Sequence, residues 1–409
     1  SGYASRNHPA EGTLHDLWAK VLVVEDPAGH ELVLISLDLV GIDRPMSQQI
    51  CKRIQQTHGI GRDQIAIATS HTHTGPVIGT NLGAMYTLES GEQQRVIDYT
   101  EKLIDTVVET TAKAFANLAP ATIQLGQGTA TFAVNRRNNP EAQVPELRSA
   151  GQLKGPFDHS VPVLAVRAGD NTLKAVVFGY ACHATVLSFY HWSGDWPGFA
   201  QIAIEKQHPE TTALFMAGCG ADQNPLPRRT VELAEEYGNQ MGAAVNAVLS
   251  SEKMEPITGR LKSSYQEIPL ALGELPTRTQ VETDTQSDNK YIVGRAKLLL
   301  KQLDEQGHLD QTYPYPVQVW RIGNQATTVV LGGEVVVDYS LRIKQEFPDH
   351  NIFVSGYSND VMAYIPSLRV LNEGGYEGAS SMIYYGLPTV WSQQVEEQII
   401  GEVHRQIDP

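Results

Sequence analysis

Short apolar runs of strand length alternate with helix-like segments along this chain, and the alternation limits the folds that it can adopt. Two neighbouring runs, at residues 21–26 and 31–40, are separated by Pro27-Ala28-Gly29, which predicts a β-hairpin. Further strands are expected at residues 65–69, 121–127, 161–168, 174–181, 212–217, 317–323, 326–333 and 351–357. Helical spacing predicts helices at residues 44–58, 92–118, 231–249 and 293–303. The sequence therefore predicts an α/β or mixed α+β protein with mixed sheets flanked by helices.

One long segment interrupts this pattern. Residues 270–292 are polar and turn-rich and have no sustained periodicity, so we expect a surface excursion or an internal boundary there. A chain of 409 residues can form several domains, but single α/β units also reach this size. We therefore treat residues 1–409 as a single domain that contains this excursion.

Charge and hydropathy argue against several kinds of partner. The chain has 31 Lys and Arg against 46 Asp and Glu, and this negative balance repels phosphate backbones, so no nucleic acid partner is expected. No apolar run reaches the ~18 residues of a membrane helix, so no membrane span is expected. Three widely spaced cysteines exclude a zinc ribbon. The start at Ser1-Gly2 shows no signal peptide, which fits a cytoplasmic or a processed protein.

Two histidines stand two residues apart where a predicted strand gives way to a turn, in the stretch SHTHTGP at residues 70–76. Side chains at i and i+2 of an extended segment share a face, so His71 and His73 can reach into one space. Neutral imidazole is the commonest metal-ligating side chain, which favours a metal site. The alternative is a chance pair with a packing or capping role. Two imidazoles do not complete a catalytic zinc site, which takes about three protein ligands.

Two other residues are candidates for the missing ligands, and a third polar loop draws notice. His183 follows the predicted strand at 174–181, where a buried core histidine is the alternative. Glu334 follows a Gly-Gly pair in an apolar region, where a carboxylate is costly unless it is ion-paired or bound to a cation. Tyr364 lies in a loop of polar and aromatic residues after another strand, where packing is the usual role of a tyrosine.

Two further loops contain candidate substrate-binding residues. Asp222 and Gln223 lie in a glycine-rich loop that either lines a pocket or turns the chain. Trp192 and Trp196 could form a pocket wall that suits a carbohydrate as well as a lipid, and ordinary packing is the alternative. Asp195 beside them could orient a ligand or hydrogen-bond a substrate hydroxyl, or serve the structure.

Taken in chain order, these stretches resemble the motifs of the neutral, non-lysosomal ceramidases, zinc amidases that cut the N-acyl bond of ceramide. The matching stretches are SHTHTGP (70–76), NRR (135–137), CHAT (182–185), GGE (332–334), SNDVMAY (358–364) and GYEGASS (375–381). The stretch EGTLHDLWAKVLVVED (11–26) resembles the start of that family's catalytic domain. Each motif is short, but their shared order spans most of the chain.

The resemblance implies a single ceramidase-like catalytic domain and assigns roles by position. The implied zinc ligands are His71, His183, Glu334 and Tyr364. His73 and Arg136 match residues that contact the substrate's polar groups. Two imidazoles, a carboxylate and a phenol oxygen are acceptable zinc donors that leave room for water. A metal-bound hydroxide would then attack an acyl carbon, with His73 transferring a proton and Arg136 stabilising charge on the carbonyl oxygen.

The chain departs from the family's pattern at three points. The family carries Gly-Asp-Val-Ser-Pro-Asn after its central strand, whereas this chain has GADQNP at 220–225, with Gln223 in the place of the serine. Val361 stands where the family often has a tyrosine. No C-terminal β-sandwich module is expected after residue 409. The changed loop borders the substrate in the family, which favours a different acyl chain or leaving group here.

The sequence therefore predicts a zinc-dependent hydrolase of an amide or ester acyl bond, acting on a small acyl substrate derived from a lipid or a sugar. Ceramide, another N-acyl amine, a sugar ester and a lactone all remain candidates, because no membrane-docking helix or apolar loop is visible. A metal-containing binding protein without turnover is the alternative. A serine hydrolase is disfavoured because the chain has no Gly-x-Ser-x-Gly stretch. The resemblance favours a secreted or periplasmic location.

Overall fold

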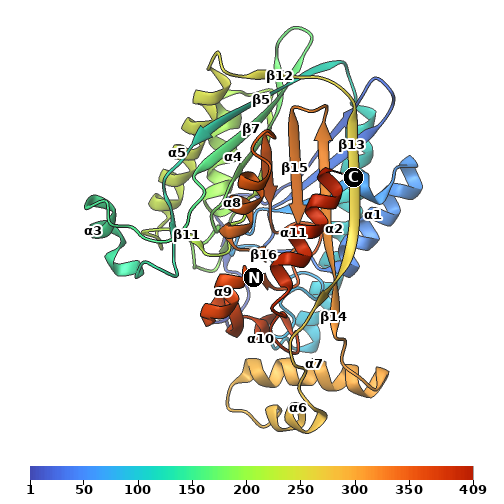
Figure 1. The fold of residues 1–409 in the computed structure, drawn as a ribbon, viewed down its shortest axis with the longest axis vertical. Coiled ribbons are helices and arrows are strands. Elements are labelled where there is room, and N and C mark those ends of the chain that lie inside the picture. The colour runs from blue at the N-terminus through green and yellow to red at the C-terminus, as the bar shows by residue number, and fades with distance from the viewer. Residues whose placement is uncertain (409) are drawn as a thin grey trace.

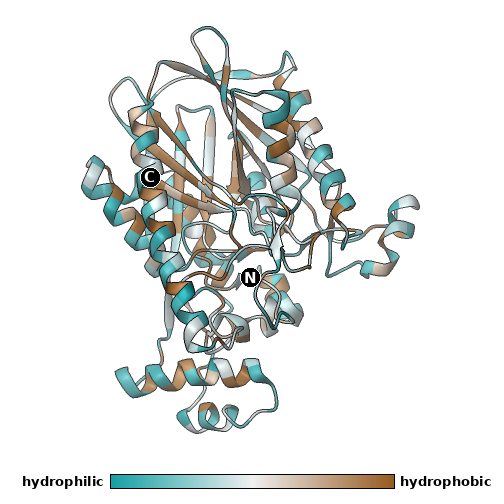
Figure 2. Ribbon diagram, turned by 180° about the vertical axis from the view of Figure 1, so that it is seen from behind, coloured by the Kyte–Doolittle hydropathy of each residue, from teal (hydrophilic) through white to brown (hydrophobic). Residues whose placement is uncertain are grey.

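Three β-sheets form the interior of the protein, and the longer helices lie on their outer sides (Figure 1). The computed structural model describes residues 1–408. The sheets contain both parallel and antiparallel neighbours, which confirms the predicted mixed α/β class. Apolar residues of all three sheets meet between them, among them Leu34, Leu214 and Trp320, and strands with brown segments mark this interior in Figure 2.

The N-terminal sheet has three strands in the order β2-β3-β4. The strands are β2 (Ala19–Glu25), β3 (Glu31–Leu37) and β4 (Ile65–Thr69), and the helices beside them are α1 (Arg44–His58) and α2 (Ser90–Ala116). The antiparallel β2–β3 pair is the predicted hairpin. Asp43 caps α1 by accepting from the Met46 N–H at 2.9 Å, and Gly59 ends the helix at a left-handed φ of 73°. Helix α1 therefore has the predicted bounds.

The central sheet has five strands in the order β10-β8-β7-β5-β12. The strands are β5 (Ala121–Thr129), β7 (Ser160–Ala168), β8 (Leu173–Tyr180), β10 (Thr212–Ala217) and β12 (Glu255–Ile257), and the helices α4 (Asp195–Gln207) and α5 (Val231–Leu249) cover it. The β8–β10 pair is parallel and the other pairs are antiparallel. The residues that follow β8 and β10 therefore lie beside the same end of these strands.

The C-terminal sheet has four strands in the order β13-β14-β15-β17. The strands are β13 (Leu261–Ala271), β14 (Thr312–Ile322), β15 (Ala326–Leu331) and β17 (Ile352–Ser355), and the helices α8 (Val337–Glu346) and α11 (Val395–Ile407) pack against it. Shorter elements complete the fold. They are β1 (Gly12–Thr13), β9 (His191–Trp192), β6 (Ala133–Asn135), β11 (Gln223–Pro225), β16 (Glu334–Val335), β18 (Tyr364–Ile365), α3 (Val144–Ser149), α9 (Leu368–Glu373) and α10 (Met382–Tyr385), with 3-10 turns at Arg62–Gln64 and Glu141–Gln143 and a π-helical turn at Tyr376–Ser380.

Residues 270–292 are more regular than their composition indicates. Strand β13 continues through Ala271, and α6 (Arg278–Asp284) and α7 (Lys290–Gln306) form a helical pair that projects from the lower end of the molecule in Figure 1. Thr277 caps α6 by accepting from the Gln280 N–H. Val281 is the buried residue of this short helix, and one apolar position is too few to give a periodic signal. Helix α6 was not predicted from the sequence for this reason.

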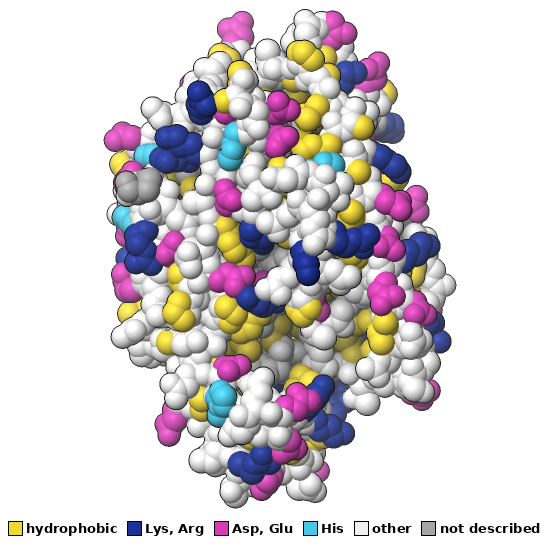
Figure 3. Space-filling view, turned by 90° about the vertical axis from the view of Figure 1, so that its right-hand side faces the viewer, with side chains coloured by type: hydrophobic (Ala, Val, Ile, Leu, Met, Phe, Trp, Pro, Cys, Tyr) yellow, Lys and Arg dark blue, Asp and Glu magenta, His cyan; other side chains and the backbone are white. Residues whose placement is uncertain are grey.

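The surface carries charges of both signs. Acidic and basic side chains are interspersed over the face shown in Figure 3, and none of its charged groups forms a large patch of one sign. Within residues 1–408, no helix combines the length and the apolar character needed to cross a bilayer.

Gly238 of α5 tests the packing of α4 against α5, and Gly401 of α11 is its control. A Cβ at Gly238 of α5 would overlap Phe199 Cβ and lie 2.9 Å from Ala200 N, whereas a Cβ at Gly401 of α11 would meet no atom within 4 Å. Gly238→Ala is therefore expected to lower the free energy of unfolding by about 1–3 kcal/mol through overpacking. Gly401→Ala, its matched control, should raise it by about 0.5–1 kcal/mol through helix propensity. Urea unfolding of both variants measures the difference, and equal effects would contradict the close packing.

Candidate metal centre

The predicted ligands come from separate segments that meet at one place. Strand β4 is followed by His71 and His73, and β8 is followed by His183. Glu334 and Tyr364 open the parallel strands β16 and β18 and are direct partners in their register. The ends of strands from different sheets thus place five polar side chains close together in the interior.

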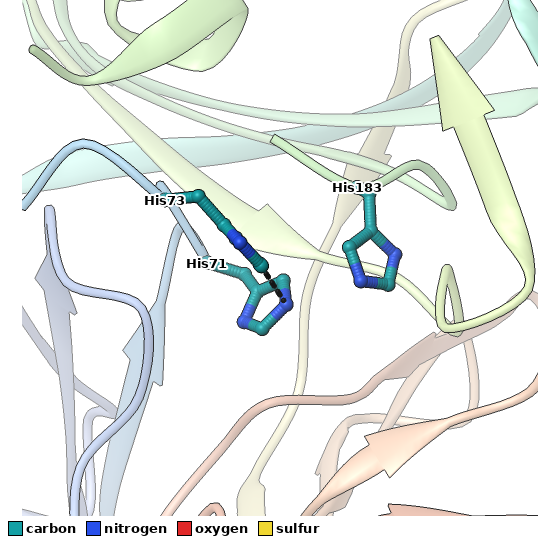
Figure 4. A group of neighbouring side chains, drawn as sticks. All are labelled: His71, His73 and His183. Carbon is teal, nitrogen blue, oxygen red and sulfur yellow. Dashed lines mark hydrogen bonds between the residues drawn. The ribbon is translucent and has the colours of Figure 1, made fainter. Parts of the chain in front are cut away.

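The donor atoms of these side chains lie close together. Glu334 Oε2 lies 3.1 Å from His71 Nε2 and 3.1 Å from His183 Nε2. Tyr364 OH lies 3.4 Å from His183 Nε2, and His73 Nε2 lies 3.0 Å from His71 Nε2. The three imidazoles turn toward a common space (Figure 4). Donors with these separations can share one metal ion at roughly 2.0–2.3 Å from each atom.

Backbone carbonyls fix which imidazole nitrogen faces this space. His71 Nδ1 contacts the Val40 carbonyl, and His183 Nδ1 lies 2.7 Å from the Gly220 carbonyl oxygen. An Nδ1–H that donates to a carbonyl leaves the lone pair on Nε2. Both Nε2 atoms therefore face Glu334 Oε2, which is buried and has no hydrogen-bond donor among residues 1–408. A cation stabilises buried acceptors that face one another, so these residues fit a divalent metal.

Burial sets the protonation of the donors. Burial, followed by Arg136, lowers the pKa of His183 to about 4, so the imidazole is neutral at pH 7. Burial, followed by Glu334, raises the pKa of the Tyr364 phenol well above its usual value. Neutral imidazoles beside a carboxylate are ligands that zinc accepts.

His73 and Arg136 flank the donor set, and their roles toward a substrate stay predictions. His73 is 9% exposed, against 1% for His71 and for His183, and its Nδ1 has no hydrogen-bond partner within residues 1–408. Burial, followed by His71, holds the pKa of His73 well below its usual value. Arg136 donates through Nη2 to Tyr364 OH at 3.2 Å. Of the three histidines, His73 is therefore the one nearest to solvent.

Backbone strain gathers in the same region. Positive φ angles occur at His71 (58°), Asp195 (53°), Tyr357 (53°) and Asn359 (63°), a conformation that residues other than glycine rarely adopt. Asn359 is held against β4, because its N–H donates to the Ile67 carbonyl at 2.7 Å and its Oδ1 accepts from the Ile67 N–H at 3.1 Å. Strained conformations that are fixed by neighbouring contacts are typical of functional sites.

Asp195 and Trp196, which the sequence analysis assigns to substrate binding, are 0% exposed. The Asp195 carboxylate accepts from the N–H groups of Val186 at 3.1 Å and Leu187 at 2.8 Å, and burial raises its pKa to about 6. Trp196 Nε1 donates to the His183 carbonyl at 2.9 Å. These contacts fix the segment that carries His183, and substrate contact by either residue stays a prediction.

Asp222 and Gln223 are also 0% exposed. Asp222 accepts at 3.0 Å from the Val337 N–H at the start of α8 and at 3.0 Å from Asn135 Nδ2, and burial raises its pKa to about 6. The Gln223 carbonyl accepts from the His183 N–H at 2.9 Å. The two residues join loops on several sides of the site, and their role in substrate binding stays a prediction.

Sequence reasoning did not identify two residues that contact the site. Tyr385 OH donates to Glu334 Oε1, and Glu377 Oε1 accepts from Arg136 Nε at 2.7 Å. Glu377 belongs to the stretch GYEGASS, so the motif order carried a signal for it. Tyr385 ends the short apolar segment MIYY, which looks like ordinary packing in the sequence.

Comparisons with known sequences point to one family. The sequence model of the family described as neutral/alkaline non-lysosomal ceramidase, N-terminal, matches residues 1–254. Neutral ceramidase from Drosophila melanogaster is 22% identical over 219 residues, which are 51% of this chain and 30% of that protein. Neutral ceramidase from Drosophila pseudoobscura pseudoobscura is 24% identical over 217 residues, with the same shares. The chain thus spans less than a third of the length of these curated relatives.

Solved structures share the fold over almost all of this chain. The crystal structure of neutral ceramidase from Pseudomonas aeruginosa superposes with a TM-score of 0.70 at 20% sequence identity, covering 96% of this chain and 68% of that one. The structure of a ceramidase complexed with C2 superposes with a TM-score of 0.71 at 18% identity, covering 97% of this chain and 70% of that one.

Asp360 provides a test of the loop that carries Tyr364. It is 3% exposed and accepts from Tyr313 OH at 2.7 Å, and burial raises its pKa to about 7. A raised pKa means that the folded state keeps a proton that the unfolded state has lost, so this group's stabilisation is lost as pH rises from about 4 to 7. Relative to Asp360→Asn, the wild type should lose about 2 kcal/mol of unfolding free energy between pH 5 and 7.

Urea unfolding of chelator-treated protein across this pH range measures the difference without metal linkage. Asp288→Asn, at an exposed position on the helical projection, controls for the loss of one negative charge. A pH-independent difference between the wild type and Asp360→Asn would contradict the buried, protonated carboxyl.

Proposed function

Because the chain belongs to the neutral/alkaline non-lysosomal ceramidase family, we propose that it is a zinc-dependent hydrolase of an amide or ester acyl bond. The observation that carries the proposal is the set of buried acceptors around Glu334 Oε2, which His71 Nε2 and His183 Nε2 approach to 3.1 Å. Without a cation these acceptors would repel one another in a low-dielectric interior. The proposed ligands are His71, His183, Glu334 and Tyr364.

The ligand types favour zinc over calcium or magnesium. Two imidazole nitrogens suit zinc, whereas calcium and magnesium prefer all-oxygen surroundings. When bound in such a site, zinc polarises an acyl carbonyl and lowers the pKa of water at the open position to roughly 7. Tyr385 orients the carboxylate by donating to Glu334 Oε1, which leaves Oε2 for the metal.

Residues beside the ligands supply the remaining chemistry. The Arg136 guanidinium is directed toward the donor set through its hydrogen bond to Tyr364 OH, a position from which it stabilises negative charge on an acyl oxygen. The depressed pKa of His73 keeps its imidazole neutral, so it can accept a proton from water and return it to the leaving group. Glu377 Oε1 accepts a hydrogen bond from Arg136 Nε at 2.7 Å and so holds the guanidinium in place.

The metal assignment predicts the behaviour of two ligand variants. His183→Ala and Glu334→Gln should each weaken zinc binding by at least about 100-fold and remove measurable amide or ester hydrolysis. His308→Ala, at an exposed histidine far along the chain, should change neither property. Zinc content by plasma mass spectrometry and turnover of acyl p-nitrophenyl esters and N-acyl amides measure both. A folded ligand variant with full zinc and full activity would refute the site.

His73 distinguishes the proposed ligand set from a site made of three histidines. If His73 transfers a proton without binding the metal, His73→Ala should keep its zinc and lose about 10²- to 10⁴-fold in kcat. Equal loss of zinc in His73→Ala and His183→Ala would instead place His73 among the ligands. Circular dichroism and melting temperature confirm that each variant is folded.

A further inference from the structure

An apolar cavity of about 310 Å³, here called the intersheet cavity, lies between the three sheets. All three sheets contribute apolar side chains to its wall, among them Leu22, Leu34, Leu164, Val177, Trp320 and Phe353. None of the candidate residues of the metal centre lines it. A cavity of this size and composition has the character of a site for an apolar ligand.

Several apolar side chains of this wall are only partly buried. They are Leu22, Val24, Val177, Ile322 and Phe353. Neighbouring residues of the same strands that do not line the cavity are covered, since Val23 is 8% exposed and Val176 is 0% exposed. Apolar surface in contact with water costs free energy in proportion to its area, so an apolar ligand between the sheets would be stabilised by covering this wall.

Packed and hydrogen-bonded groups close the cavity along the strands. A Cβ at Gly179 of β8 would overlap the Phe353 ring, so this ring lies directly against the backbone of β8. Ser36 and Ser355 stand two residues after Leu34 and Phe353 and therefore share their faces of β3 and β17. Both serine hydroxyls donate to backbone carbonyls of β10, at 2.7 Å and 3.0 Å. The intersheet cavity is thus a site apart from the metal centre.

The mouth of the cavity is polar and carries both signs of charge. Gln127, Lys253, Glu255 and Asn351 line it and are exposed. A carboxylate head would be attracted by Lys253 but repelled by Glu255, and an ammonium head would meet the reverse. A hydroxyl or an amide both accepts and donates hydrogen bonds, so an uncharged head can accept from Lys253 and donate to Glu255.

We propose that the intersheet cavity binds the alkyl chain of a single-chain lipid whose uncharged hydroxyl or amide head stays at the mouth. An apolar cavity of ~150 Å³ holds one benzene molecule, so a cavity about twice that size accepts roughly a dozen carbon atoms. A second alkyl chain does not fit. Because the cavity is separate from the donor set, the lipid that it holds is not the molecule being cleaved.

Binding of 1-alkanols with 6 to 14 carbons tests the size of the site. Alkanols have the proposed head and no bond that a hydrolase cuts, so the result does not depend on the proposed function. In calorimetric titrations below the solubility limit of each alkanol, Kd should fall by about fourfold for each added CH₂. The fall should stop near about 12 carbons, where the cavity is full. Absence of binding, or a Kd that keeps falling at the same rate to 14 carbons, overturns the proposal.

Charged analogues test the mouth. Dodecanoate and dodecylammonium, titrated below their micelle concentrations, should each bind about twofold to fivefold more weakly than 1-dodecanol. Glu255→Gln should remove the penalty for dodecanoate, whereas Glu252→Gln, at an exposed position outside the lining, should keep it. Tighter binding of either charged analogue than of dodecanol to the wild type refutes the uncharged head.

A filled cavity tests the location. Val24→Phe places a ring in the cavity and should weaken dodecanol binding by about tenfold or more, with zinc content and hydrolysis unchanged. Val21→Phe, on the other face of the same strand, is the matched control and should bind dodecanol like the wild type. Circular dichroism confirms that both variants are folded, and the alkanol series needs no variant. Full dodecanol binding by folded Val24→Phe refutes the assignment of the site.

Discussion

The structure depends on one electrostatic constraint, the meeting of three acceptors at Glu334 Oε2. Carbonyl partners on the Nδ1 side of His71 and His183 leave both Nε2 lone pairs facing a carboxylate oxygen at 3.1 Å. In an interior that water does not reach, this arrangement is costly unless a cation fills it. The donor set is therefore more informative about function than a surface histidine pair, because Glu334 Oε2 is buried without a hydrogen-bond donor among residues 1–408.

The surrounding fold keeps these acceptors together. Asp222 ties the start of α8, which follows Glu334, to the loop of Asn135, and Asp195 holds the backbone of Val186 and Leu187 after His183. Each of these carboxyl groups is buried, and burial raises the pKa of Asp222 and of Asp195 to about 6. Asp195 and Asp222 are not among the candidate ligands. Their desolvation is offset by the hydrogen bonds that hold the loops between the sheets, because these loops have few ladder hydrogen bonds of their own.

Local sequence signals predicted the regular elements and only part of the site. Helix α1 could be bounded because Asp43 and Gly59 mark its ends, and His71 and His73 attracted notice because strand geometry alone places them on one face. Glu334 was a candidate ligand because a carboxylate is costly in an apolar region, whereas Tyr364 became one only through the family's motif order. The strands that pair them, β16 and β18, are two residues long and give no periodic signal. The contact of Tyr385 with Glu334 and the burial of Asp195 and Trp196 depend on tertiary packing, which a single sequence does not reveal.

The candidate ligands and the walls of the polar cavity come from different parts of the chain. The candidate ligands follow β4 and β8 or stand in β16 and β18, which the sheets hold in place. The walls of the polar cavity of about 560 Å³ beside Arg136 belong to the loop after β6, to β11 and the loop after it, to the end of α9 and to the π-helical turn at Tyr376–Ser380. Substitution of wall residues changes few contacts of the core, whereas movement of a ligand strand would break the register of a sheet. A chain of this fold can therefore vary the wall of the cavity without moving the strands that carry the candidate donors.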